Sequence, residues 1–357
     1  MNRPRATNYP YGAGSCLARN ARKCSTSMAQ QIHHQSDERA PEDSTARASS
    51  IRWKILRRAL LRRHTDNESQ LGIDRISRRA SSDGFKLIPF QVVEPGARNW
   101  DNPDSSSTTE MPHSVKDAVV CYKLPIDGSP KLFLKQRLEN QEDLHDFEIC
   151  NQYNIDNTGL VCLWPSEEVL SYYCLSNAEI FRSKRVIELG SGYGLAGLVI
   201  AAATEASEIV ITDGNPQVVD YIQHNIQVNS GAFGSTKVNS MLLHWKQMQV
   251  SSTPDTFDII IASDCTFFKE FHADLAWTVK LLLKEAGPSE ALFFSPKRGD
   301  SLGKFLEEAS KHDLKCSIVE NYDATVWNRH QDLLAGDGSW SSYLMDHCYP
   351  LLVRIMK

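Results

Sequence analysis

The chain has 357 residues, of which 41% are hydrophobic and 23% charged, so it can hold one large globular domain with extensions or two domains. No apolar run approaches the roughly 20 residues that a membrane-spanning helix needs, and we therefore do not expect an integral membrane protein. The net charge of −5 hides a basic arm, because residues 1–80 carry 16 Lys and Arg against 7 Asp and Glu, which predicts an anionic partner for the arm or its contact with the acidic remainder.

Nine cysteines and eleven histidines give no sign of a metal site. The cysteines form no Cys-x-x-Cys pair and lie largely in apolar segments, and the histidines have no ligand spacing. This pattern predicts buried free thiols in a reducing compartment and no bound metal. A cytoplasmic location, with the nucleus as an alternative, agrees with it.

Residues 1–50 are rich in Ser, Ala, Arg, Gln and Pro and have almost no apolar periodicity, which predicts a disordered tail. The first 36 residues contain no acid and several arginines and serines, a composition that weakly resembles an organelle transit peptide. Targeting is therefore the alternative reading of this tail.

A basic amphipathic helix is predicted for Ile51–His64, within a helix and linker at 51–82. Trp53, Leu56 and Leu60 fall on one face at helical spacing, and arginines flank them. Such a face suits an acidic groove or an anionic membrane surface; the other reading is that it packs on the rest of the protein.

Residues 83–156 are predicted to form a small β-rich subdomain. Period-two patterns indicate strands at Phe85–Val93 and Ala118–Leu124, a short strand at Leu132–Leu134, and a further strand at Leu144–Cys150.

An α/β domain is predicted for residues 157–357. Pro165 can open a helix whose first turn carries Glu167 and Glu168, which are favourable against the helix dipole. Trp164 at the entry of this helix either lines a ligand pocket or is buried in the core.

Residues 184–216 have the pattern of a strand, a glycine turn, a helix and a second strand, the half-unit of a nucleotide-binding fold. Gly190, Gly192 and Gly194 allow the backbone to turn tightly and to approach a ligand. The apolar segment Leu195–Ala203 is the predicted helix.

The acids of this half-unit indicate which cofactor it binds. Asp213 follows Gly190 by 23 residues, at the end of the second strand, where an acid meets ribose hydroxyls. The glycines alone fit a dinucleotide or S-adenosylmethionine. Glu188 lies just before the turn, and because its charge would repel a pyrophosphate, S-adenosylmethionine is favoured.

The remaining elements alternate as in a doubly wound sheet. Asn215 caps and Pro216 opens a helix predicted at Gln217–Asn229. The patterns then predict strands at 241–245, 257–264, 291–295, 314–319 and 349–355 and helices at 271–284 and 301–312. The last two strands are joined by an irregular insertion, which predicts an antiparallel pair. The expected fold is a Rossmann-like α/β sheet of seven strands, the last antiparallel, with an N-terminal helical and β-rich extension.

These motifs resemble those of the seven-β-strand methyltransferases that modify lysines of non-histone proteins. The similarity covers residues 157–357 and is carried by Gly159–Trp164, Glu188–Gly197, Thr212-Asp213, Asn225-x-x-x-Asn229, Leu243–Trp245 and Asp264-x-x-Phe267. Within this family, the basic segment at 51–64, the β-rich region and the strand end Ser-Pro-Lys-Arg298 are similar to the enzymes that methylate calmodulin.

The resemblance implies S-adenosylmethionine as methyl donor, S-adenosylhomocysteine as product, and calmodulin as the protein substrate, methylated on a lysine to the trimethyl state. It implies that the cofactor is bound by Trp164, Glu188, Gly190, Gly192, Gly194, Asp213, Trp245 and Ser263. Asp264 and Phe267 would lie where the lysine enters and take part in catalysis. Many relatives have Tyr in place of Phe267, so we expect no role for a phenol hydroxyl. The face made by Trp53, Leu56 and Leu60 would dock the substrate.

Three alternatives remain open: lysine methylation of another non-histone protein, methylation of a small molecule or nucleic acid, and a calmodulin-binding module with a vestigial methyltransferase fold. The acidic catalytic half and the lack of an Asn/Asp-Pro-Pro-Tyr/Phe signature disfavour a nucleic-acid substrate. Intact glycines and the acids Glu188, Asp213 and Asp264 argue against a vestigial fold.

Overall fold

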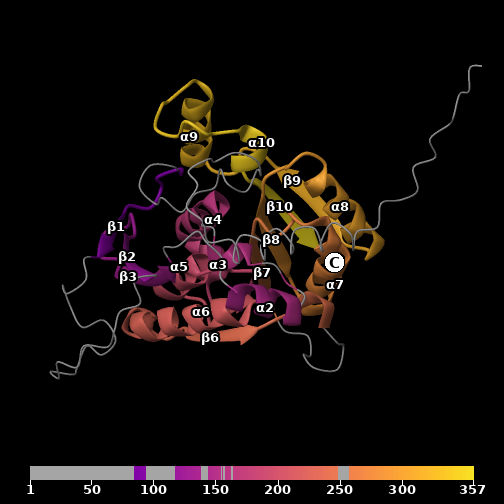
Figure 1. Ribbon diagram of the computed structural model, residues 1–357, viewed down its shortest axis with the longest axis horizontal. Helices are drawn as coiled ribbons and strands as arrows, with labels where there is room; N and C mark the ends of the chain where they lie inside the picture. The colour runs from indigo at the N-terminus through magenta and orange to yellow at the C-terminus, as the bar shows by residue number, and fades with distance from the viewer. Residues whose placement is uncertain are drawn as a thin grey trace, which may run out of the picture. The chain divides into compact units, whose positions relative to one another are not determined.

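The computed structural model describes residues 84–93, 117–137, 144–153, 155, 157–161, 164–247 and 257–357 (Figure 1). The tail at 1–50 and the predicted basic helix at Ile51–His64 lie outside these residues. No helix in the described part of the chain is long and apolar enough to cross a bilayer.

A seven-stranded sheet forms the centre of the α/β part, in the order β6-β5-β4-β7-β8-β10-β9. Its strands are β4 (Arg185–Leu189), β5 (Glu208–Asp213), β6 (Lys237–Leu242), β7 (Ile259–Ser263), β8 (Glu290–Ser295), β9 (Lys315–Val319) and β10 (Leu351–Met356). Neighbours from β6 to β8 are parallel, and β10 is antiparallel to both β8 and β9. The predicted fold class, including the antiparallel last strand, is confirmed.

The register of the central strands determines where a ligand can bind. β4 from Val186 onward and all of β7 are buried without alternation, as strands covered on both faces are, and Ile187 pairs with Ile260 at full burial. On the other side of β4, Glu188 lies opposite Ile211 of β5. The carboxyl ends of these three parallel strands therefore meet at one edge of the sheet, where ligands bind in open α/β folds.

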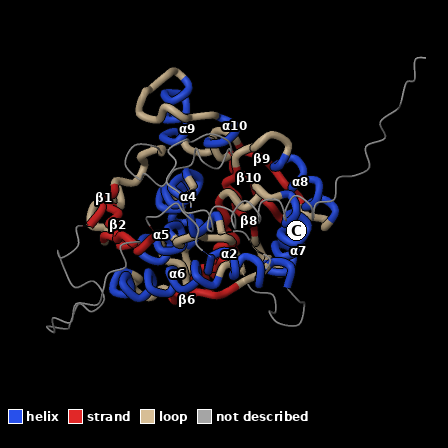
Figure 2. Tube along the Cα trace, in the orientation of Figure 1, coloured by secondary structure: helices blue, strands red, loops and turns tan. Residues whose placement is uncertain are grey.

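Helices cover both faces of the sheet. They are α4 (Pro165–Ser176), α5 (Leu195–Ala203), α6 (Pro216–Asn229), α7 (His272–Leu282), α8 (Ser301–Lys311) and α9 (Ala324–Leu334), with the shorter α3 (Thr158–Val161) and α10 (Met345–Cys348). α4 packs on α5 and α7 packs on α8. Right-handed crossovers place α5 and α6 on one face and α7 and α8 on the other, and Figure 2 shows these two pairs on opposite sides of the strands.

A smaller antiparallel sheet comes before the large one in the chain: β1 (Phe90–Val93), β2 (Asp117–Lys123) and β3 (Lys131–Arg137). Helix α6 binds its β3 edge through two amides, since Asn225 accepts from and donates to the backbone of Lys135 at 2.8 and 3.2 Å. Asn229 makes the same pair of bonds with Phe133 at 2.9 and 2.7 Å. Two Asn residues one helical turn apart thus replace a fourth strand, which explains the Asn-x-x-x-Asn motif.

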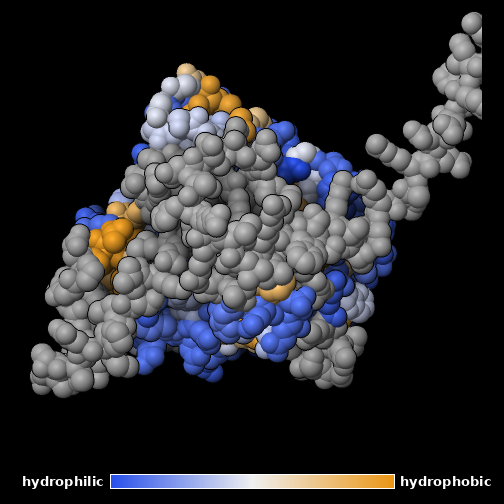
Figure 3. Space-filling view, viewed as in Figure 1, coloured by the Kyte–Doolittle hydropathy of each residue, from blue (hydrophilic) through white to orange (hydrophobic). Residues whose placement is uncertain are grey.

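Strand β1 leaves a hydrophobic patch at the surface. Phe90 and Val92 are 42% and 54% exposed, and Figure 3 shows the patch over this strand. The strand predicted from Phe85 begins only at Phe90, because Phe85 and Ile88 are buried in a loop instead of being paired in the sheet.

The loop before β1 is held by two helices that follow much later in the chain. Glu168 of α4 accepts hydrogen bonds from the amides of Leu87 and Ile88 at 2.6 and 3.2 Å. Arg329 of α9 donates to the Phe85 carbonyl at 3.1 Å. These contacts span 80 to 244 residues of sequence.

Two predictions of local structure were wrong. The segment Leu144–Cys150 is helix α2 (Leu144–Tyr153) and not a strand, because its apolar residues recur every third position, which is helical spacing. The insertion before the last strand, expected to be irregular, contains α9, which Asp323 caps by accepting from the amides of Thr325 and Val326.

Strand β6 was predicted four residues too late. It runs over Lys237–Leu242, and Trp245 begins a separate 3-10 helix, Trp245–Gln247. β6 lies at the edge of the sheet and is only partly buried, so its strongest apolar run, Met241–Leu243, marks the end of the strand and not its middle.

Candidate functional site

A cavity of about 230 Å³ lies at the carboxyl ends of β4, β5 and β7. Eight of the ten predicted site residues line it: Trp164, Gly190, Gly192, Asp213, Trp245, Ser263, Asp264 and Phe267. The other two, Glu188 and Gly194, are not among its lining residues, although each lies two positions in sequence from a residue that is. No group of three or more His, Cys, Asp or Glu in the described residues could hold a metal ion.

The glycine turn has a conformation that other residues adopt only with strain. Gly190, Gly192 and Gly194 have φ angles of 58°, 56° and 78°. A Cβ on Gly190 would lie 2.8 Å from the Cys265 sulfur, and one on Gly194 would lie 3.0 Å from Ile211. The turn therefore runs close to both neighbouring strands and leaves the space above it open.

Asp213 connects the glycine turn to the end of β5. Its Oδ2 accepts a hydrogen bond from the Gly192 amide at 3.1 Å, and its Oδ1 accepts one from the Asn215 amide at 2.9 Å. Each carboxylate oxygen has a second lone pair, so the group can also accept bonds from a ligand hydroxyl in the cavity. The contact of Asp213 with ribose hydroxyls stays a prediction, and Asp213 lines the cavity where such a contact would be made.

Two carboxyl groups occupy the first turn of α5, the usual anion site of a nucleotide-binding fold. Glu167 of α4 accepts from the Ala196 amide at 2.8 Å and from the Ser263 hydroxyl at 2.5 Å. Glu188 of β4 accepts from the Gly197 amide at 2.9 Å. A phosphate would need these same amides, so the chain's own carboxyls exclude the pyrophosphate of a dinucleotide.

Burial changes the charge of these two acids. It raises the pKa of Glu188 well above its usual value, and the neighbouring Glu167 carboxyl raises it further. Burial also raises the pKa of Glu167. Two neighbouring carboxyls in a buried site cannot both ionise without a large cost, so the protonated form of Glu188 is favoured.

Five aromatic side chains form one side of the cavity. Their ring centroids lie 4.6 to 6.2 Å apart in the series Trp164, Phe267, Phe268, Phe271, Trp245. Such a wall excludes water and presents ring faces that attract cations. Trp164 and Trp245, which the sequence predicts on either side of the cofactor, are the two ends of this series.

Asp264 is paired with an arginine that follows β8. Arg298 donates from Nε to Oδ1 of Asp264 at 2.9 Å and from Nη2 to Oδ2. The guanidinium also lies 4.9 Å from the Trp164 ring centroid and 5.0 Å from that of Phe267. Asp264 does not cap the next helix, since the N-cap of α7 is Phe271.

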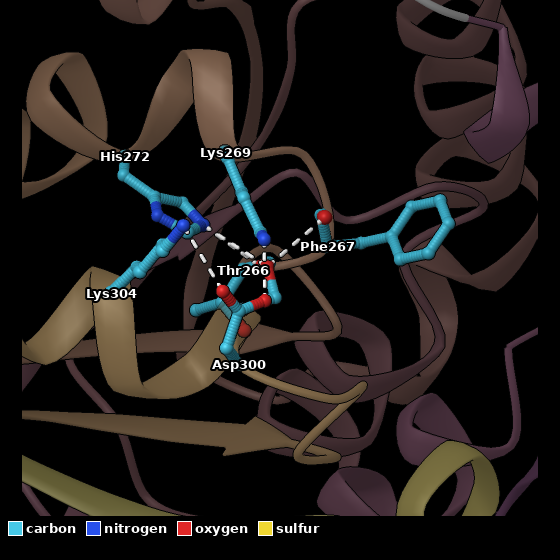
Figure 4. A network of polar contacts seen from close by, with 7 residues as sticks. Thr266, Phe267, Lys269, His272, Asp300 and Lys304 are labelled. Carbon is cyan, nitrogen blue, oxygen red and sulfur yellow. Dashed lines mark hydrogen bonds and ion pairs between the residues drawn. The ribbon is translucent and has the colours of Figure 1, made fainter. Parts of the chain in front are cut away.

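The loop after β7 is fixed by hydrogen bonds to its carbonyls (Figure 4). The Thr266 carbonyl accepts from His272 Nε2 at 2.9 Å and from the Ser301 hydroxyl at 2.6 Å. Burial lowers the pKa of His272, so the ring is neutral and carries its hydrogen on Nε2. Figure 4 shows the Phe267 ring pointing away from this network. The ring centroid lies 5.9 Å from that of Trp164 and 4.6 Å from that of Phe268.

Comparisons with known proteins identify the family. The model of the lysine methyltransferase family matches residues 142–312. A calmodulin-lysine N-methyltransferase of Arabidopsis thaliana is 61% identical over 314 residues, which cover 88% of this chain and 98% of that protein. The chain belongs to the lysine methyltransferase family.

Other lysine methyltransferases are more distant from this member of the family. The human protein-lysine N-methyltransferase EEF2KMT is 22% identical over 70% of this chain and 90% of its own length. The mouse protein N-lysine methyltransferase METTL21A is 30% identical over 33% of this chain and 52% of its own length. Among solved structures, an S-adenosylmethionine dependent methyltransferase from Mesorhizobium loti aligns with a TM-score of 0.38 at 14% identity, covering 54% of this chain and all of that one.

The cofactor of this lysine methyltransferase is S-adenosylmethionine, and the residues present fit it. S-adenosylmethionine carries a positive charge and has no phosphates. It therefore fits a site in which carboxyl groups already bind the first amides of α5 and aromatic rings line one side. Asp213 and the turn at Gly190 would hold its ribose and methionine portions, and the two tryptophans would flank it.

Sequence reasoning missed two side chains at this site. Glu167 was expected only to favour a helix dipole, although its place in the first turn of α4, directly after the cavity residue Trp164, is a signal that it lies near the cavity. Arg298 was noted only as the last residue of the segment Ser-Pro-Lys-Arg298, which follows a strand and is similar in sequence to the family members that methylate calmodulin. Its partner precedes it by 34 residues, and no local pattern reveals such a contact.

Proposed function

We propose that this protein transfers methyl groups from S-adenosylmethionine to a lysine of calmodulin. The observation that carries the proposal is the 61% identity to a calmodulin-lysine N-methyltransferase over 98% of that protein's length. The geometry agrees with it, because the cavity holds a carboxylate and several aromatic rings at its edge, which suit the long cationic side chain of lysine.

The side chains of the cavity would act mainly by positioning. When bound, S-adenosylmethionine supplies an electrophilic methyl group. The acceptor amine must be neutral to attack, and the aromatic wall favours that form by removing water from around it. Asp264 and Phe267 would hold the amine in line with the methyl group, and holding two reactants in line provides most of the acceleration in such a reaction.

The direct test is incubation with labelled S-adenosylmethionine and unmethylated calmodulin. We expect label on one calmodulin lysine, and mass spectrometry of the tryptic peptides would identify that lysine and count its methyl groups, with the trimethyl state as the expected end point. Calmodulin that binds the protein without acquiring label would support the vestigial module. Label on another protein, with none on calmodulin, would support a different substrate.

The basic segment at 51–64 is proposed to recruit the substrate. Trp53, Leu56 and Leu60 would contact calmodulin, while the +9 charge of residues 1–80 would speed its encounter with an acidic protein. Deleting residues 51–80 should raise KM and remove its dependence on salt. Two further variants separate the contributions: replacing the three apolar residues with Ala should raise KM but keep the salt dependence, and replacing the flanking arginines with Gln should reduce it. An unchanged salt dependence in the folded deletion variant would contradict recruitment by charge.

A further inference from the structure

Arg298 contacts three residues of the cavity wall at once. Its guanidinium makes a two-point ion pair with Asp264 and lies over the rings of Trp164 and Phe267. A planar guanidinium satisfies both kinds of contact, because its edge matches a carboxylate and its face stacks on aromatic rings. A lysine at this position could make only part of these contacts.

The ion pair is buried. The side chains of Arg298 and Asp264 are 5% and 3% exposed. Removing two charges from water costs free energy that the attraction between them does not always recover, and a buried pair is therefore poor support for stability alone. Its two-point geometry does fix the orientation of the carboxylate.

Both partners of the ion pair have a left-handed backbone. Asp264 has φ 55° and Arg298 has φ 45°, a conformation that is unfavourable for residues with a Cβ. Backbone hydrogen bonds hold both in place, from the Asp264 amide to Phe294 at 2.9 Å and from the Arg298 amide to Asp346 at 2.8 Å. Strained backbone at both ends of one side-chain contact indicates that the contact has a function.

Arg298 and the three residues that it contacts differ in whether they line the cavity. Asp264, Trp164 and Phe267 are among the described residues that line the cavity, and Arg298 is not. Arg298 therefore contacts three residues of the wall without being one of the residues that line the cavity.

We propose that Arg298 is a positioning residue of the methyl-transfer site, which holds the Asp264 carboxylate and the rings of Trp164 and Phe267 in the arrangement that receives the acceptor lysine. This inference rests on the proposed function, since it assumes that a lysine enters at Asp264 and Phe267. Arg298 acts through the wall and does not bind the cofactor.

The first test compares Arg298→Lys and Arg298→Met with the wild-type protein in methyl transfer to calmodulin. We expect kcat to fall about 100-fold in Arg298→Met, because a displacement of about 1 Å can cost that much, and to fall less in Arg298→Lys, which keeps the charge and the fold. The affinity for S-adenosylmethionine, measured by calorimetry, should change less than about threefold. The control is Arg354→Met, which removes the ion pair with Glu290 outside the cavity and should leave kcat unchanged.

A second test uses chemical rescue. Arg298→Gly relieves the left-handed backbone and leaves a space bounded by Asp264, Trp164 and Phe267, which guanidinium ion at millimolar concentration should fill. We expect guanidinium to restore kcat in this variant and sodium at equal ionic strength not to do so. A purely structural role predicts instead a lower melting temperature with normal kcat below it.

The possible outcomes are distinct. If the wild-type protein is active and Arg298→Lys and Arg298→Met both keep its kcat, the inference is overturned and the proposed function stands. If the wild-type protein transfers no methyl group to calmodulin, the proposed function fails and the inference fails with it. A selective loss of kcat that guanidinium restores supports both.

Discussion

The carboxyl groups of Glu167 and Glu188 meet beneath the glycine turn although one comes from α4 and the other from β4. They accept hydrogen bonds from the adjacent amides of Ala196 and Gly197, and the Glu167 carboxyl raises the pKa of Glu188. Two carboxyls in contact in a buried site cannot both ionise without a large cost. The pair therefore links the protonation of the site to the stability of the fold.

Glu188→Gln should flatten the dependence of stability on pH. Burial raises the pKa of Glu188 in the folded protein well above 4.5. The protonated carboxyl therefore contributes fully to the free energy of unfolding below the unfolded-state pKa, and this contribution is lost as pH rises through the folded-state pKa. Gln does not titrate, and the free energy of unfolding should therefore fall less between pH 5 and pH 9 in this variant, as urea denaturation would measure. The control is Glu179→Gln, which changes an exposed acid paired with Arg182; equal slopes in wild type and Glu188→Gln would contradict the prediction.

Gly197→Ala should destabilise the protein by about 1–3 kcal/mol, the usual cost of overpacking. A Cβ at this position would lie 2.6 Å from both Glu188 Oε2 and Ile211. The matched control is Gly303→Ala in α8, where a Cβ would meet no atom within 4 Å, and which should stabilise by about 0.4–1 kcal/mol. Thermal denaturation of both variants would check the sign of each effect, and equal effects would show that Gly197 has room for a methyl group.

Asp264→Asn should lower kcat at least 100-fold while the affinity for S-adenosylmethionine stays within about threefold, because positioning of the amine is lost and the turn at Gly190 is untouched. Both Asn and Ala leave the buried charge of Arg298 without a counter-charge, at a cost of about 3–5 kcal/mol, but Asn keeps a hydrogen-bond acceptor for the guanidinium and Ala does not, so Asp264→Ala is the less specific variant. Calorimetry and single-turnover assays would separate the two effects. Full activity of Asp264→Asn, or loss of cofactor binding, would reject the role assigned to Asp264.

Replacing Asn225 and Asn229 with Ala should loosen the small sheet without unfolding the large one. Four hydrogen bonds to the backbone of β3 would be lost, at about 1 kcal/mol each. Hydrogen exchange should increase in β2 and β3 and remain slow in β4 and β7. The control is Gln223→Ala on an exposed part of α6, and equal exchange in the two variants would mean that the Asn residues do not hold the sheet.

The elements that the sequence predicts well are those whose pattern is local. The short apolar pair Val186-Ile187 before the glycine turn marks β4, the apolar run Ile259–Ala262 before Asp264 marks β7, and Asn215 with Pro216 marks the start of α6. The same local signals bring Asp213, Trp164 and Phe267 to one cavity. Each of these residues stands at the end of an element whose place in the sheet follows from strand order.

The features that the sequence does not predict depend on distant contacts or on weak local patterns. The pairing of Arg298 with Asp264 requires the ends of β7 and β8 to be adjacent in space, and the raised pKa of Glu167 requires burial that only packing provides. Helix α9 begins at Ala324, after its cap Asp323 and an edge strand, in a region where polar residues obscure the periodicity. Reasoning by periodicity cannot recover such contacts.

The hydrogen bond between Arg329 and Phe85 also imposes an order on synthesis and folding. It joins residues 244 positions apart. At about 5–20 residues per second, the loop before β1 leaves the ribosome roughly 12–50 s before α9 exists to receive it. During that interval the loop before β1 lacks its α9 partner, so its apolar residues Phe85 and Ile88 would be exposed to chaperones on the growing chain until the C-terminal helices are made.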